Sequence, residues 1–204
     1  IGSLLTVLVI FLVSYVIFDS NIYDELYSKI EVTAHRGNST VTMPNTIPAF
    51  KEAIKEGADY GELDVRQTKD IVVTHDASLK EMTGQDINVR DLTYEELQKI
   101  PCIEVNGNKC TVPKLEDVIN VCKGKIKLNI EIKTGNNDSE DFVSDVVKII
   151  ENTDFVDKCV VTSLDYRALR KVKECNPKIK TGYIMAVAMG DFYDLPCVDF
   201  FSME

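Results

Sequence analysis

From residue 31 onward, short β-branched segments alternate with segments of helical periodicity, and this alternation limits the possible folds most. In residues 44–57, for example, Ile47, Phe50, Ala53 and Ile54 recur on one helix face before Gly57 ends the pattern. Strands separated by helices pair in parallel, and at this length a barrel is favoured over a doubly wound sheet. We therefore expect an α/β fold, a (β/α)8 TIM-type barrel that is incomplete here, with about six of eight strands. The expected strands lie near residues 31–35, 60–65, 127–132, 159–163, 181–185 and 198–202.

Residues 1–18 contain no charged side chain and are long enough to cross a hydrocarbon core of about 30 Å. This pattern predicts a transmembrane helix. A signal peptide is the rival interpretation, but the segment lacks a basic start and a small-residue cleavage site before Asp19. A buried soluble helix is the third interpretation. The expected organisation is a transmembrane helix at residues 1–18, a juxtamembrane linker at 19–30 and one C-terminally truncated domain at 31–204.

The composition is strongly acidic, with a formal net charge of −10, and every charged residue follows the apolar segment. Such a surface repels nucleic acid, so we expect no nucleic-acid partner. Asp19, Asp24 and Glu25 accompany Lys29 just after the apolar segment, without the basic excess of a cytoplasmic flank. We therefore expect a membrane protein whose folded domain faces outside the cytoplasm.

A β-hairpin is predicted between residues 60 and 75. Only six residues separate Val65 from Val72, too few for a parallel crossover, so residues 71–75 should run antiparallel to residues 60–68. A two-residue loop at Lys69–Asp70 pairs Asp64 directly with His75, whereas a slipped register makes them diagonal neighbours.

The two histidines of the chain, His35 and His75, each end a predicted strand beside an arginine or a carboxylate. One histidine at a strand end is more often a structural hydrogen-bonding group. Two histidines, both placed in this way, favour acid–base chemistry.

Three acidic residues also occupy predicted strands. Glu62 and Asp64 are two residues apart and point to one face, and Glu131 has a similar place on another strand. A single carboxylate at a strand end is usually only solvated, but three that converge repel one another unless a cation joins them. Oxygen ligands suit Ca²⁺ or Mg²⁺ better than zinc.

Two cationic residues follow the same strands. Arg36 and Lys133 carry the hydrogen-bond donors that a phosphate group requires, and a guanidinium can bind phosphate in a bidentate manner. The alternative is that both belong to surface ion pairs.

Together these residues resemble the glycerophosphodiester phosphodiesterase family, of the membrane-anchored type. His35-Arg36, Glu62-Leu63-Asp64 and His75-Asp76 are similar to the family's HR, ExD and HD elements, in the same order. The segments PNTIPAF and NIEIK are similar as well, and the likeness covers about residues 31–204. It implies metal-dependent hydrolysis of a small-molecule glycerophosphodiester to sn-glycerol 3-phosphate and an alcohol.

The resemblance also implies a role for each candidate. His35 and His75 would be the general acid and base, and Arg36 and Lys133 would bind the substrate phosphate. The implied metal ligands, for Ca²⁺ or Mg²⁺, are Glu62, Asp64 and Glu131.

The sequence departs from the family pattern at several positions. The family's PENT element reads Met43-Pro44-Asn45-Thr46, so its glutamate is missing, and Asn45 is the remaining candidate for binding the phosphate. The turn before His75 is two residues shorter than usual, and Glu81 stands where a basic residue is common. The chain has no tryptophan, although the family's closing strands carry one.

Two other functions compete with this one. Paired carboxylates in a barrel also serve glycoside hydrolases, but that reaction leaves both histidines and Arg36 without a role. A membrane-anchored barrel that binds glycerophosphodiesters without turnover is the non-enzymatic alternative.

Overall fold

The computed structural model describes residues 30–185 and 195–203, and from Thr33 onward they belong to one compact unit. The predicted transmembrane helix at residues 1–18 and nearly all of the linker lie outside the described residues. Within the described ranges, no helix has the length and apolar character that crossing a membrane requires. The strands are β1 (Thr33–Ala34), β2 (Tyr60–Gln67), β3 (Ile71–Val73), β4 (Lys127–Ile132), β5 (Cys159–Ser163), β6 (Lys180–Met185) and β7 (Phe200–Met203). The helices are α2 (Ile47–Lys55), α3 (Lys80–Thr83), α4 (Tyr94–Leu97), α5 (Leu115–Cys122), α6 (Phe142–Asn152) and α7 (Tyr166–Cys175), with 3-10 turns η1 (Val89–Asp91) and η2 (Val156–Lys158).

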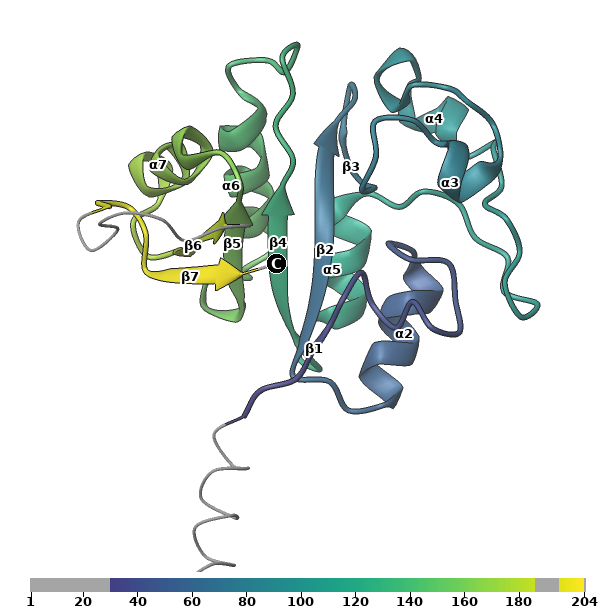
Figure 1. Cartoon of the computed structure of the whole chain (residues 1–204), viewed down its shortest axis with the longest axis horizontal. Helices are drawn as coiled ribbons and strands as arrows, with labels where there is room; N and C mark the ends of the chain where they lie inside the picture. The colour runs from purple at the N-terminus through teal and green to yellow at the C-terminus, as the bar shows by residue number, and fades with distance from the viewer. Residues whose placement is uncertain (1–29, 186–194, 204) are drawn as a thin grey trace, which may run out of the picture. The chain divides into compact units, whose positions relative to one another are not determined.

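Across the sheet, the parallel strands stand in the same order as along the chain. The parallel strands are ordered β1-β2-β4-β5-β6-β7, and β3 lies off this path and pairs with β2. A doubly wound sheet reverses its strand order at a switch point, whereas this order continues in one direction, as in a barrel. In Figure 1, β2 and β4 run upright and β6 and β7 run nearly crosswise, so the sheet is strongly curled. The predicted parallel α/β architecture is confirmed as a partial barrel, and closure by eight strands stays a prediction.

The main hydrophobic core lies between the sheet and the helices. Leu63 and Val65 of β2 are fully buried there, in one cluster with Leu115 of α5 and Val146 of α6. Because side chains alternate along a strand, the residues between them point to the other face of the sheet. This alternation directs Glu62 and Asp64 to the inner side of the curled sheet.

A second, smaller core supports the segment between β3 and α5, which carries α3, η1 and α4. Its members are buried apolar residues, including Val72, Leu79, Met82 and Leu97. A capping box begins α4, because Thr93 accepts from the Glu96 amide and the Glu96 carboxylate accepts from the Thr93 amide. Helix α4 has four residues, about a single turn.

The hairpin prediction is correct in direction and wrong in register. Strand β3 is antiparallel to β2, but Gln67 pairs with Ile71 and Val65 with Val73, so the loop has three residues instead of two. Thr68 causes the difference: its amide donates to the Asp70 carbonyl at 2.8 Å, and its hydroxyl accepts from the Asp70 amide at 2.9 Å. As a result the Thr74 amide donates to the Asp64 carbonyl at 3.0 Å, and His75 is not the residue opposite Asp64.

Replacing Gly37 by alanine should destabilise the fold by about 2–4 kcal/mol, from left-handed strain and a steric clash. Gly37 has φ +75°, and an added Cβ would lie 2.7 Å from the backbone carbon of Ala49. Gly57→Ala is the control, because Gly57 has φ +79° but no neighbour within 4 Å of such a Cβ. Urea unfolding should show a larger loss for Gly37→Ala, and equal losses would contradict the predicted clash.

Candidate active site

Three buried carboxylates converge on the inner side of the sheet. Asp64 on β2 and Glu131 on β4 are direct partners in the parallel register, and Glu62 precedes Asp64 by two residues on the same face. One carboxylate oxygen from each residue lies within 4.8 Å of the others. The exposed fractions are 7% for Glu62, 1% for Asp64 and 4% for Glu131, so little water screens their mutual repulsion.

Two cationic side chains lie against the acids. Lys133 follows β4, and its Nζ is 2.7 Å from Glu131 Oε1 and 3.3 Å from Asp64 Oδ1. Arg36 follows β1, and its Nε is 3.4 Å from Asp64 Oδ2. Burial lowers the pKa of Lys133, but the hydrogen bond to Glu131 and the charge of Asp64 outweigh burial, so its pKa is raised.

The three carboxylates outnumber the two cations, so the cluster would carry a net negative charge if all three acids were ionised. Burial, together with the charge of Asp64, raises the pKa of Glu62 to about 8, although the Arg36 amide donates to Glu62 Oε2 at 2.8 Å and opposes the shift. A carboxyl with such a pKa carries a proton at neutral pH unless a further cation joins the cluster. Three oxygen donors within ligand reach therefore fit a divalent cation such as Ca²⁺ or Mg²⁺.

The loop between β1 and α2 holds Asp64 in place through two strained residues. Arg36 and Asn45 have φ of 55° and 59°, which costs about 1–2 kcal/mol for each non-glycine residue. The Asn45 amide group donates to Asp64 Oδ2 at 2.8 Å, and its oxygen accepts from the Asp64 backbone amide at 3.3 Å. The Asn45 side chain therefore orients a candidate metal ligand, and its predicted binding of the phosphate stays a prediction.

The two histidines flank the acidic cluster. His35 is 66% exposed in its side chain, and its Nε2 lies 3.8 Å from Glu62 Oε2. His75 lines a narrow pocket together with Arg36 and Asn45, and its Nδ1 is 2.8 Å from Asp76 Oδ1. Because Asp76 engages Nδ1, the Nε2 atom of His75 is the one that can exchange a proton with a ligand.

Sequence reasoning missed one residue at this site. Arg66 lies two residues after Asp64 on β2, and its Nε donates to the His75 carbonyl at 2.6 Å. Because side chains alternate along a strand, Arg66 lies on the same face of β2 as Glu62 and Asp64.

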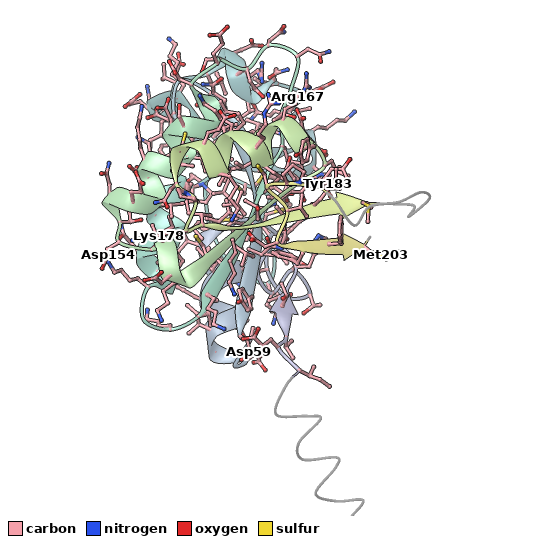
Figure 2. All side chains as sticks on the ribbon, turned by 90° about the vertical axis from the view of Figure 1, so that its left-hand side faces the viewer. Asp59, Asp154, Arg167, Lys178, Tyr183 and Met203 are labelled. Carbon is pink, nitrogen blue, oxygen red and sulfur yellow. The ribbon has the colours of Figure 1, made fainter. Side chains whose placement is uncertain are left out.

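A larger hollow lies at the other ends of the strands. It has a volume of about 490 Å³, and its lining includes Asp59, just before β2, and Lys127, the first residue of β4. Figure 2 labels Asp59 at this end and Arg167, which follows β5, at the opposite end. In (β/α) barrels the active site lies at the carboxyl ends of the strands, which favours the acidic cluster.

The stability of the cation-free protein should fall as pH rises from about 5 to about 8. The pKa of Glu62 in the folded protein, about 8, exceeds the ordinary value of 4.5, so the folded state binds the extra proton over this range. Urea unfolding at several pH values checks this slope, and Glu62→Gln should flatten it. Added Ca²⁺ or Mg²⁺ should stabilise the wild-type protein most at high pH, and a cation effect that is the same at all pH values would contradict the account.

The fold and the site together indicate a class of enzyme. A curled parallel sheet that carries buried acids and two cations, with two histidines beside them, is typical of barrel hydrolases that act on phosphate esters with a divalent cation.

The chain belongs to the glycerophosphoryl diester phosphodiesterase family, whose model matches residues 35–191. A glycerophosphodiester phosphodiesterase from Caldanaerobacter subterraneus subsp. tengcongensis is 36% identical over 162 residues, which are 76% of this chain and 67% of that protein. A lysophospholipase D from Mus musculus is 35% identical over 153 residues, which are 65% of this chain and 48% of that protein. The chain thus spans from about half to two thirds of these relatives.

The solved structures agree on the fold. A phosphodiesterase from Oleispira antarctica, in complex with the product sn-glycerol-3-phosphate, has a TM-score of 0.71 and 26% identity. The match covers 78% of this chain and 67% of that one. A family structure from Silicibacter pomeroyi has a TM-score of 0.71 over 80% of this chain and 67% of that one, at 22% identity.

Proposed function

We propose that the protein hydrolyses glycerophosphodiesters to sn-glycerol 3-phosphate and an alcohol, with Ca²⁺ or Mg²⁺ as its cofactor. The observation that carries this proposal is the meeting of three buried carboxylates with Arg36 and Lys133, between two histidines. The names of the relatives and the product bound in the Oleispira antarctica structure support the same reaction.

The charged residues divide into cation ligands and phosphate ligands. Glu62, Asp64 and Glu131 would hold the divalent cation, which when bound neutralises developing charge on a phosphoryl oxygen. Arg36 and Lys133 lie beside these acids and would bind the remaining phosphate oxygens. Asn45 keeps Asp64 oriented, so that ligand and phosphate sites stay in a fixed relation.

The histidines would transfer the protons. One would remove a proton from the attacking water, and the other would give a proton to the leaving alkoxide, so that the bond from phosphorus to the alcohol oxygen breaks as the bond to water forms. His75 has Nε2 available for this step, because its Nδ1 faces Asp76. His35 approaches the cluster from the side of Glu62.

Incubation with a panel of glycerophosphodiesters, with Ca²⁺ and Mg²⁺ supplied separately, tests the reaction. We expect sn-glycerol 3-phosphate together with the free alcohol of each diester that is accepted. Cleavage of a glycoside substrate alone would favour the glycoside hydrolase interpretation. Saturable binding of a diester without product would favour a binding domain.

A further inference from the structure

We propose that Arg66 is a positioning residue that fixes the backbone of His75, and thereby the imidazole, relative to the carboxylate cluster. The inference rests on the proposed function for its kinetic consequences, whereas the positioning itself can be measured without activity.

The contact between the two residues is direct. Arg66 lies on the inner face of β2, two residues after Asp64, and its Nε donates to the His75 carbonyl oxygen at 2.6 Å. A hydrogen bond from a guanidinium is charge-assisted and about twice as strong as a neutral one. The strand that supplies two of the candidate cation ligands therefore also holds the candidate proton-transfer residue.

The register of the hairpin explains why such a contact is needed. Strand β3 ends at Val73, and beyond the ladder the Thr74 amide donates to the Asp64 carbonyl of β2. Regular alternation from Thr74 would turn His75 to the other face of the sheet. Instead the chain leaves the ladder, and His75 lines the pocket that also contains Arg36 and Asn45. The bond from Arg66 ties the chain to β2 at this departure.

Three carboxylates lie near Arg66. Burial lowers the pKa of its guanidinium overall, although the charges of Asp76, Asp64 and Glu131 oppose this shift, and a guanidinium keeps its proton in proteins. The side chain thus lies in the field of both the carboxylate cluster and Asp76, the partner of His75.

A double-mutant cycle tests the proposal. Arg66→Gln should lower kcat by about 10–100-fold, the usual effect of losing a residue that orients an active group, with KM nearly unchanged. In a His75→Ala background the same substitution should change kcat less than about 2-fold, because the group it positions is absent. Equal losses in both backgrounds, or an unchanged kcat for Arg66→Gln, would overturn the inference.

Two controls separate positioning from damage to the fold. Arg66→Lys keeps the positive charge, and its kcat loss should also vanish in the His75→Ala background. Arg170→Gln removes a matched charge, because Arg170 forms an exposed pair with Glu174 on α7, and it should leave kcat unchanged.

Nuclear magnetic resonance of the imidazole nitrogens detects the positioning of His75 by Arg66 even if no diester is cleaved. The chain has only two histidines, so the His75→Ala variant assigns both rings. Arg66→Gln should shift the His75 ring signals and leave those of His35 in place. Unchanged His75 signals would overturn the inference, whereas shifted signals in a protein without activity would leave it standing and contradict the proposed function.

Discussion

Replacing His75 by alanine should lower kcat by about 10²–10⁴-fold, the range expected when a general acid or base is lost. His35→Ala should have an effect of the same order. Neither side chain belongs to the hydrophobic cores among the described residues. Loss of activity should therefore occur without loss of the fold.

Steady-state kinetics and thermal unfolding of the two single variants and the double variant check this prediction. The double variant should retain only the catalysis that the charged cluster supplies by binding the phosphate. A double variant with near wild-type kcat would eliminate both acid–base roles. If only one histidine matters, the other is a binding residue.

Removing the divalent cation should lower activity by about 10³-fold or more, because its charge stabilises the transition state by several kcal/mol. Asp64→Asn should have a comparable effect that added cation does not reverse. This substitution removes one carboxylate and leaves Lys133 and Arg36 without one of their charge partners. Glu174→Gln is the matched control, because Glu174 is an exposed residue paired with Arg170.

Calorimetric titration of the chelator-treated protein with Ca²⁺ and with Mg²⁺ measures the binding itself. We expect one cation for each molecule of wild-type protein and much weaker binding to Asp64→Asn. Full activity after exhaustive chelation, or equal cation affinity of both proteins, would contradict the metal assignment.

The sequence predicted most of the sheet correctly because its signals are local. The β-branched segments at residues 127–132 and 159–163 coincide with β4 and β5. Alternation along β2 and parallel pairing with β4 explain why Glu62, Asp64 and Glu131 could be placed together without a structure. The membrane prediction for residues 1–18 lies outside the described residues and stays a prediction.

The errors come from contacts that no local pattern shows. The hairpin register depended on the Thr68 hydroxyl, which bonds within the loop and moves the pairing by one residue. The second core depends on residues as distant in sequence as Met43 and Val112. Asn45 contacts Asp64 across 19 positions, a contact that the PNT segment alone does not show, and phosphate binding by Asn45 stays a prediction.

Cation-dependent diester hydrolysis is tested by the rate of sn-glycerol 3-phosphate formation from glycerophosphocholine as Ca²⁺ or Mg²⁺ is added to the cation-free protein. We expect a rate that rises with cation concentration to a plateau in the wild-type protein and stays near background in Asp64→Asn. No product from a folded, cation-saturated wild-type protein, or equal rates for both proteins, would contradict it.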